Sequence, residues 1–243
     1  MKTLVIIPSR MSATRLPGKP LLKINGLSII SHVSKKAEEA NIGEVIVATE
    51  DQEIVDDVKR NGFNAILTSN QHKTGTDRIH EALKKSNIKD VDLIMNLQGD
   101  EPAINIEDII NLNKKMTIYP SQMGTLAAKI NNDNDLENEN IVKVITNKNL
   151  KDDGFSRAEN FLRDCSKQDN IYHHIGIYCY SAETLERFVK LEQSQNEIKN
   201  RLEQLRALDN NIEINVSLAK SSPIGVDTEE DYLALKKIME YKS

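Results

Sequence analysis

Short apolar runs alternate with amphipathic stretches through the first half of this chain, and this alternation restricts its fold more than any other feature. The runs at 4–7, 44–49, 65–68 and 92–97 are rich in Val, Ile and Leu and have the length of buried strands. Stretches with apolar residues at helical spacing separate them. Strands that alternate with helices form right-handed βαβ units, so the sequence predicts an α/β fold with a mostly parallel sheet flanked by helices.

Local signals mark the ends of the predicted helices. Ser28 is a suitable N-cap for a helix through Ala40, and Asp51 opens a helix that Gly62 stops. Asn25-Gly26 is a turn signal. Further helices are predicted after Thr76, at 105–116, 183–191 and 197–208, and after a sequence at 228–231 that resembles a capping box with Asp in place of Glu.

The second half is predicted to continue the sheet with strands at 123–130, 141–145, 171–180 and 212–218. Its polar stretch at 131–140 is expected to be a solvated loop, and 148–170 is expected to be rich in loops. No internal repeat or interdomain linker is visible, so a single domain is expected.

Charge and hydropathy exclude several classes of partner. The chain has 243 residues with 32 Lys plus Arg against 37 Asp plus Glu, so 32 − 37 gives a net charge of −5 and no basic footprint for nucleic acid. No apolar run is long enough to span a membrane, and the N-terminus is unlike a signal peptide. Cys165 and Cys179 are the only cysteines, and they are expected to be reduced rather than to bind zinc.

A loop with three cations follows the first predicted strand. Pro8 ends that strand, and Arg10, Arg15 and Lys19 come next. Like charges on one loop repel unless an anion lies among them, and in an open α/β sheet ligands bind at the carboxyl ends of the strands. An ordinary basic surface loop would have the same composition, but the order of the residues favours an anion site.

Two carboxylates have the placement of metal ligands. Asp100 lies just after the run at 92–97, beside Gly99, which lets a ligand approach the backbone closely. A carboxylate at a strand end near a cationic loop suits Mg²⁺ on a triphosphate. Asp227 precedes the last helix, where Thr228 is the better cap and leaves Asp227 available.

The order of residues also resembles a known family. Pro8-Ser-Arg10 and Thr14-Arg-Leu-Pro-Gly-Lys-Pro20 resemble the nucleotide-binding loop of the 3-deoxy-manno-octulosonate (Kdo) cytidylyltransferases, the CMP-Kdo synthetases. The other blocks that carry the resemblance follow in the family's order over nearly the whole chain: Ile46-Val-Ala-Thr49, Thr74-Gly-Thr-Asp-Arg78, Asn96-Leu-Gln-Gly-Asp-Glu-Pro102, Phe155-Ser-Arg-Ala158, His174-Ile-Gly-Ile-Tyr178, Leu202-Glu-Gln-Leu-Arg206 and Gly225-Val-Asp-Thr228.

The resemblance implies a Rossmann-like, GT-A-like nucleotidyltransferase fold in one domain of residues 1–243. Residues 1–117 would bind CTP, 118–220 would bind the sugar and form a homodimer, and 221–243 would carry a metal-binding Asp and a closing helix. The implied reaction transfers CMP from CTP to the anomeric hydroxyl of Kdo, with release of pyrophosphate, for lipopolysaccharide synthesis. The implied cofactor is Mg²⁺ and the implied location is the cytoplasm.

The family's site residues map onto this sequence. Asp100 and Asp227 would hold Mg²⁺, and Arg10, Arg15 and Lys19 would cradle the phosphates, with Arg15, Lys19 and Asp100 acting in catalysis. Base selection maps onto Thr74, Gly75, Arg78 and Gln98, and contact with the sugar maps onto Arg157, His174, Glu203 and Gln204. The guanidinium fork of Arg157 suits the carboxylate of a keto-sugar acid.

Simpler interpretations stay open for several of these residues. Arg78 would also fit a solvated helix residue paired with an acid, and His174 would also fit a core histidine. Glu203 and Gln204 would fit the outer face of a helix, and Glu101 would fit either metal binding or a structural turn.

Two departures from the family pattern fall on the sugar side. The family usually continues the Ser-Arg motif with Ile-Pro, whereas this chain has Ala158-Glu159. It usually has a second acid where this chain has Asn200, although Glu197 is kept. These changes keep open an alternative to Kdo transfer, the same reaction on an 8-amino or sialic-acid-like keto sugar. A non-catalytic nucleotide-binding module is a separate alternative, and the presence of Asp100, Asp227, Arg15 and Lys19 together argues against it. A dinucleotide-dependent oxidoreductase is disfavoured because no G-x-G-x-x-G follows the first strand.

Overall fold

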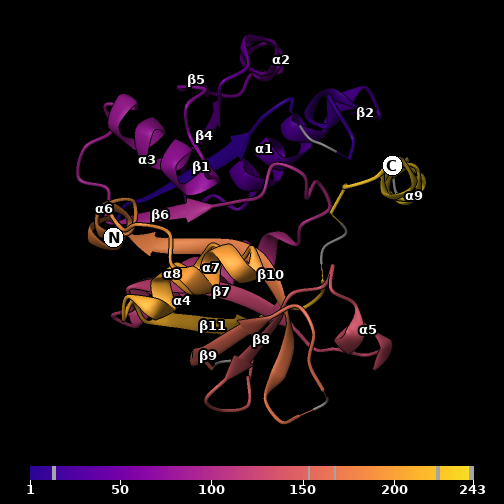
Figure 1. The fold of residues 1–243 in the computed structure, drawn as a ribbon. Coiled ribbons are helices and arrows are strands. Elements are labelled where there is room, and N and C mark those ends of the chain that lie inside the picture. The colour runs from indigo at the N-terminus through magenta and orange to yellow at the C-terminus, as the bar shows by residue number, and fades with distance from the viewer. Residues whose placement is uncertain (13–14, 153, 167, 223–224, 241–243) are drawn as a thin grey trace. The chain divides into compact units, whose positions relative to one another are not determined.

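The computed structural model describes residues 1–12, 15–152, 154–166, 168–222 and 225–240, which divide into two compact units (Figure 1). The first unit consists of Met1–Ile110 together with Pro223–Ser243, and the second consists of Asn111–Ser222. Chain segments from both ends of the sequence therefore contribute to the first unit.

A parallel sheet in the order β5-β4-β1-β6 forms the centre of the first unit. β1 (Thr3–Ser9) lies between β4 (Gly43–Thr49) and β6 (Leu93–Asn96), and β5 (Ala65–Leu67) pairs with β4. The side chains of β1 from Leu4 to Ile7 are fully buried, as expected for a parallel strand that is covered on both faces. The strands predicted in this half of the sequence are confirmed to within two residues at each end.

Helices cover this sheet, and the order of its strands reverses beside β1. α1 (Ile29–Glu39) and α3 (Gly75–Lys85) both pack on β1 and β4, and they lie on opposite sides of these strands, while α2 (Gln52–Arg60) packs on β4 and β5 (Figure 1). The chain runs outward from β1 to β4 and β5, and then returns to the other side of β1 at β6. The carboxyl ends of β1 and β6 therefore flank the point where the strand order reverses, which is where α/β folds bind ligands.

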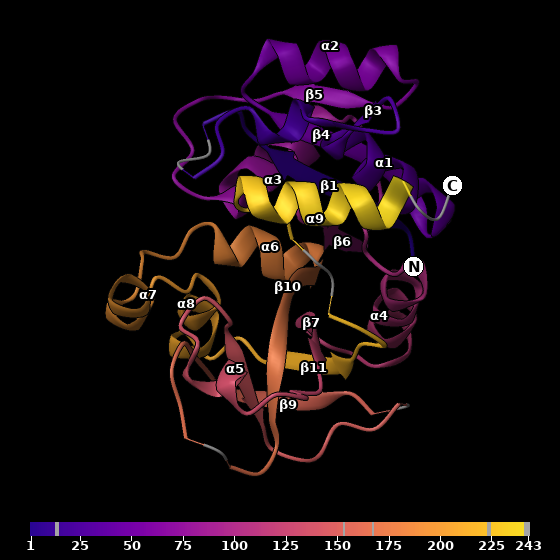
Figure 2. The same cartoon turned by 90° about the vertical axis from the view of Figure 1, so that its right-hand side faces the viewer.

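The C-terminal helix belongs to the first unit. α9 (Glu229–Glu240) packs beside the hairpin of β2 (Lys23–Ile24) and β3 (Leu27–Ser28), with Leu235 in a buried cluster with Ile24, Ile29 and Val226 (Figure 2). Two predictions of local structure are confirmed here. Asn25 and Gly26 both have positive φ, 49° and 80°, as a tight hairpin turn requires. Thr228 and Asp231 cap α9 reciprocally, each side chain accepting from the other's backbone N–H.

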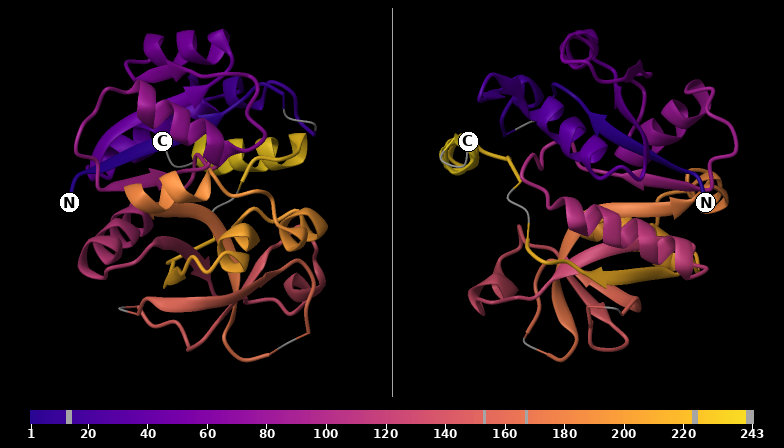
Figure 3. Two further views of the ribbon diagram at one scale, coloured as in Figure 1. Left: turned by 60° about the vertical axis from the view of Figure 1, so that its left-hand side comes forward. Right: turned by 180° about the vertical axis from the view of Figure 1, so that it is seen from behind.

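The second unit has a mixed sheet in the order β10-β7-β11-β9-β8. β11 (Ile214–Leu218) is parallel to β7 (Met123–Ala128), whereas β8 (Lys143–Thr146), β9 (Ser156–Leu162) and β10 (Ile171–Ser181) form antiparallel pairs. Because β8 also pairs with β10, the five strands close on themselves (Figure 3). The prediction of a mostly parallel sheet is therefore wrong: the chain combines parallel and antiparallel pairs.

Two local predictions in this unit are also wrong. The stretch at 131–140 contains a short helix, α5 (Asn134–Glu137), which the buried Leu136 anchors. The stretch at 148–170 is rich in loops, as predicted, but it also contains the strand β9, which was not predicted. The helix predicted at 197–208 is two helices, α7 (Gln195–Asn200) and α8 (Gln204–Asp209), because Arg201 has a left-handed backbone with φ 53°.

Two further α-helices and the short 3₁₀ helix η1 (Lys19–Leu21) complete the described elements of the chain. α4 (Ile106–Ile118) begins in the first unit, and its residues from Asn111 onward belong to the second, while α6 (Ala182–Phe188) follows β10. None of the helices in the described ranges has the length and apolar character that a membrane span requires.

Candidate active site

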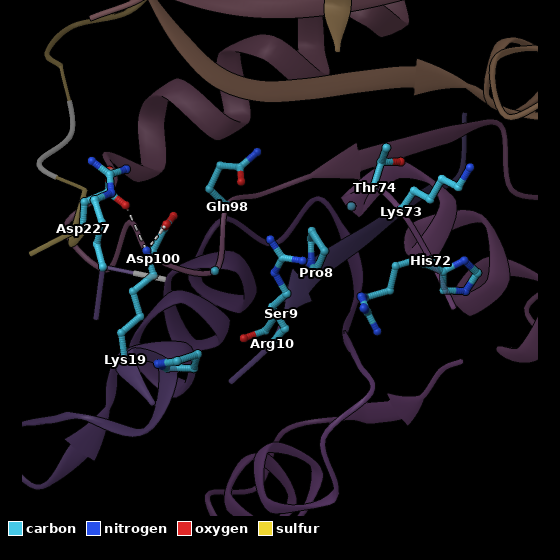
Figure 4. Close-up of a pocket in the computed structure, with 15 residues that line it drawn as sticks. Pro8, Ser9, Arg10, Lys19, His72, Lys73, Thr74, Gln98, Asp100 and Asp227 are labelled. Atoms are coloured by element: carbon cyan, nitrogen blue, oxygen red, sulfur yellow. Dashed lines mark hydrogen bonds and ion pairs between the residues drawn. The ribbon is translucent and has the colours of Figure 1, made fainter. Parts of the chain in front are cut away.

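A cavity of about 390 Å³ opens at the carboxyl ends of β1 and β6 in the first unit (Figure 4). Every residue that the sequence assigned to nucleotide or metal binding lies in its lining. The complete lining is Pro8, Ser9, Arg10, Arg15, Lys19, Pro20, His72, Lys73, Thr74, Gly75, Arg78, Gln98, Gly99, Asp100 and Asp227.

An ammonium group joins the two predicted metal ligands. Lys19 Nζ lies 2.6 Å from Asp100 Oδ2 and 3.2 Å from Asp227 Oδ1, and it also donates to Val226 O at 2.7 Å (Figure 4). Arg15 Nη2 donates to the other oxygen of Asp227 at 2.9 Å. The two carboxylates, which are far apart in the sequence, therefore converge on one position that a cation occupies.

Backbone contacts bring these acids together. Val226 N donates to Asp100 O at 2.9 Å, which holds the segment before α9 against the end of β6. A Cβ on Gly99 would lie 2.9 Å from Pro8 O and 3.1 Å from Ile30 Cδ1. Only glycine fits at this close approach between the ends of β1 and β6.

The cationic loop is anchored by a residue whose role the sequence did not reveal. Asp51 is at the N-cap position of α2, as predicted, but its carboxylate makes no cap hydrogen bond and instead accepts from Met11 N at 2.7 Å. The hydroxyl of Thr49 accepts from Asp51 N at 3.1 Å and fixes that residue in turn. The carboxyl end of β4 thus holds the start of the loop that carries Arg10.

The cavity residues that are predicted to bind the nucleobase include a buried arginine, Arg78. Thr74 caps α3, with its hydroxyl accepting from Asp77 N at 3.2 Å. Arg78 is 4% exposed, and its guanidinium pairs with Glu50 and donates to Thr68 Oγ1 at 2.7 Å. The solvated interpretation of Arg78 is therefore wrong, and its paired guanidinium forms a fixed wall of the cavity.

Sequence reasoning missed two basic residues in the lining, His72 and Lys73. The imidazole of His72 pairs with Glu81 on α3, while Lys73 is exposed. The signal that could have found them is their position immediately before the Thr74-Gly75 turn.

The acidic pair has the donor set that Mg²⁺ prefers. Mg²⁺ is usually held by one or two carboxylates together with substrate phosphates, and Asp100 and Asp227 already converge on a cation. Glu101 lies next to the pair, and its buried Oε2 has no hydrogen-bond partner among the residues that the structure describes. Burial, then the charges of Asp100 and Asp227, raise the pKa of Glu101 to about 8. The residues therefore fit a magnesium site in which Asp100 and Asp227 would be the protein ligands.

The residues predicted to bind the sugar all lie in the second unit, in different environments. Arg157 on β9 is exposed, and its guanidinium has no partner among the described residues. Gln204, at the start of α8, is 5% exposed, so the outer-face interpretation is wrong for this residue. Glu203 comes just before it, and Glu203 Oε1 lies 3.7 Å from Arg206 Nη2. The Arg157 guanidinium is therefore exposed to a polar ligand, whereas the buried Gln204 Nε2 has no hydrogen-bond partner among the described residues.

His174 is a buried, neutral histidine on β10. It is 7% exposed and packs edge-on against Phe161, with ring centroids 4.9 Å apart. Burial, and then the neighbouring His173, lower the pKa of His174 to about 3. Its Nε2 lies 3.1 Å from Thr125 Oγ1.

This histidine should make the folded state less stable in acid. The unfolded chain takes up a proton near pH 6.5, whereas folded His174 stays neutral to about pH 3, so the free energy of unfolding falls as pH falls through this window. At pH 5 the loss from this residue should be about 2 kcal/mol relative to pH 7. Urea unfolding of wild type and His174→Gln at both pH values checks this. Equal losses in the two proteins would contradict it.

Glu197, the acid of the family pattern that this chain retains, makes contacts that stabilise the local fold. Arg206 is 3% exposed, and it donates to both oxygens of Glu197, at 2.7 and 2.5 Å. The carboxylate of Glu197 also completes a capping box with Ser194. Asn200 donates to Asn196 O at 2.9 Å within the same helix, and Glu159 is exposed. The described hydrogen bond of Asn200 is thus local to α7.

A parallel sheet flanked by helices, with cations and two carboxylates at its switch point, is typical of a nucleotide-binding α/β protein. Comparison with known proteins shows which family of such proteins the chain resembles. A family model described as "Cytidylyltransferase" matches residues 4–214. A solved structure of CMP:2-keto-3-deoxy-manno-octonic acid synthetase complexed with CTP superposes with a TM-score of 0.91 at 33% identity, over 100% of both chains.

Curated relatives identify the particular family. The 3-deoxy-manno-octulosonate cytidylyltransferase of Thermodesulfovibrio yellowstonii is 42% identical over 98% of both chains. The protein of the same name from Mesorhizobium japonicum is 39% identical over 98% of this chain and 99% of its own. The chain belongs to the 3-deoxy-manno-octulosonate cytidylyltransferase family.

Proposed function

We propose that this protein transfers CMP from CTP to the anomeric hydroxyl of Kdo. The oxygen of that hydroxyl forms a bond to the α-phosphorus, the bond from the α-phosphorus to the bridging oxygen breaks, pyrophosphate leaves, and the hydroxyl proton passes to solvent. The observation that carries the proposal is the convergence of Asp100, Asp227 and Lys19 at the end of the parallel sheet, in a chain 42% identical to a named Kdo cytidylyltransferase.

The residues of the first unit divide the work on CTP. Arg10, Arg15 and Lys19 face the cavity and would bind the phosphates, stabilising the charge that builds up on the leaving pyrophosphate. Asp100 and Asp227 would hold Mg²⁺, which when bound neutralises phosphate charge and lowers the pKa of the attacking hydroxyl. Thr74, Gly75, Arg78 and Gln98 would form the base pocket.

The residues of the second unit would bind the sugar. Arg157 would hold the carboxylate through two hydrogen bonds, while His174, Glu203 and Gln204 would contact hydroxyl groups. The proposal includes a homodimer that works in the cytoplasm, where CTP is available, and a product that serves lipopolysaccharide synthesis.

The sugar can be tested directly. Purified protein is incubated with CTP, Mg²⁺ and one acid at a time from Kdo, its 8-amino analogue and a sialic acid, and released pyrophosphate is measured. We expect rapid release with Kdo, with CMP-Kdo detected by mass. Preference for another acid would favour the alternative substrate, and no release with any acid would favour a nucleotide-binding module.

A substitution of Arg157 should separate the sugar from CTP. Arg157→Lys keeps the positive charge but loses the planar fork that binds a carboxylate through two bonds. We expect the KM for Kdo to rise about tenfold, or about 1.4 kcal/mol, with the KM for CTP little changed. Arg60→Lys, an exposed arginine on α2, is the matched control. An unchanged KM for Kdo in Arg157→Lys would remove this residue from the site.

A further inference from the structure

Thr125 on β7 is a fully buried hydroxyl that the proposed reaction does not use. Its Oγ1 lies 2.7 Å from Ile177 O, 3.2 Å from Ile175 O and 3.1 Å from His174 Nε2. Both carbonyls lie at the irregularity in β10, where the pairing register with β7 shifts between Ile175 and Tyr178. The irregularity therefore turns both carbonyl oxygens to one hydroxyl.

The geometry around this hydroxyl fixes the direction of its hydrogen bonds. A hydroxyl has one hydrogen to donate and two lone pairs that accept. Carbonyl oxygens only accept, so the hydrogen of Thr125 must go to them, with Ile177 O the nearer. The contact to His174 then has to be a bond in which Nε2–H donates and Thr125 Oγ1 accepts.

The tautomer of His174 follows from this direction. A neutral imidazole carries its proton on one nitrogen and a lone pair on the other, and the hydrogen bond of one nitrogen decides the state of the other. With the proton on Nε2, Nδ1 holds the lone pair, and it has no partner among the described residues. The site thus contains an acceptor that cannot act as a donor.

We propose that Thr125 is a positioning residue that holds His174 as the Nε2–H tautomer, so that Nδ1 accepts a hydrogen bond from a hydroxyl group of the sugar acid. The sugar contact rests on the proposed function, whereas the tautomer does not. The aromatic contacts help to fix the ring, since the ring centroids of His174 and Phe161 are 4.9 Å apart and those of His174 and Tyr178 are 5.5 Å apart.

The tautomer is measured first, in the wild-type protein without any ligand. ¹⁵N–¹H NMR of protein labelled in its histidines separates protonated from unprotonated ring nitrogens, and His174→Gln assigns the signal. We expect Nε2 to be protonated and Nδ1 to be bare at pH 7. A proton on Nδ1 would overturn the proposal whether or not the enzyme acts on Kdo.

The positioning role is measured with two substitutions at Thr125. Thr125→Val has nearly the same shape but cannot accept, whereas Thr125→Ser keeps the hydroxyl. We expect Val to raise the KM for Kdo about tenfold, with the KM for CTP unchanged, and to mix the two tautomers, because an outer hydrogen-bond partner orients the ring that it contacts. Ser should restore both properties.

A separate variant controls for the general effect of removing a buried hydroxyl. Ser217→Ala removes another fully buried hydroxyl, on the neighbouring strand β11, and should leave the KM for Kdo unchanged. If Thr125→Val fails to fold, the wild-type spectrum and the Ser variant still decide the proposal. An unchanged KM for Kdo in a folded Val variant, or a Ser variant no better than Val, would overturn the positioning role.

Discussion

Asp100→Asn and Asp227→Asn should each lower kcat by about a thousandfold or more while the protein stays folded. Each change keeps the shape of the side chain but removes a negative oxygen from the position on which both carboxylates converge. Loss of a metal ligand removes several kcal/mol of transition-state stabilisation, and about 4 kcal/mol corresponds to a factor of about a thousand. Turnover is measured by pyrophosphate release in saturating Mg²⁺, CTP and Kdo.

The controls for these variants separate chemistry from folding. Asp56→Asn changes an exposed carboxylate on α2 and should retain full activity. Melting temperatures should stay close to wild type, since Asp100 and Asp227 lie at the cavity and are 31% and 48% exposed. Near-normal kcat in either Asn variant would show that the carboxylate is not a ligand. Chelation of Mg²⁺ should abolish the activity of the wild-type protein. Addition of Mn²⁺ should restore that activity, because oxygen ligands also suit this ion.

The first unit could be predicted from the sequence because its signals are local. A strand such as β1 is buried on both faces, so it is an unbroken apolar run, and β4 and β6 follow the same rule. Ser28 and Thr74 cap their helices through their own side chains, which a sequence shows directly. The switch point then follows from the order of the strands.

The second unit could not be predicted in the same way, because its sheet is defined by long-range pairing. β9 has only Ala158 and Phe161 buried within Ser156–Leu162, which gives no clear alternation. The direction of each strand depends on partners far along the chain, such as β8 with β10. The break between α7 and α8 rests on one left-handed residue, Arg201, a residue type that seldom adopts this conformation.

The candidate site shows the same division between local and distant information. Motifs identified Lys19, Asp100 and Asp227 as site residues, but not that Lys19 would bond to both acids. They also missed Glu50 and Thr125, since a residue that orients another carries no motif of its own. Such partners become visible only when the strands are assembled.

Removal of the Lys19 ammonium should have opposite effects on metal and on nucleotide. In the structure this ammonium pairs with both carboxylates, so it competes with a divalent cation for the same oxygens. Lys19→Met removes this positive charge, and Arg15, which pairs with Asp227, is then the remaining cation beside the acids. We therefore expect Mn²⁺, measured by electron paramagnetic resonance without CTP, to bind several-fold more tightly than to wild type.

With CTP present the sign should reverse, because the ammonium that leaves the acids when metal binds would be available to the phosphates. The KM for CTP in Lys19→Met should rise about tenfold, equivalent to about 1.4 kcal/mol, while the KM for Kdo stays nearly constant. Lys36→Met, which breaks a lysine–glutamate pair on the surface of α1, should change neither quantity. Weaker Mn²⁺ binding together with weaker CTP use would mean that Lys19 supports the metal site rather than competing for it. An unchanged KM for CTP in Lys19→Met would mean that Lys19 does not bind the phosphates and only links Asp100 and Asp227.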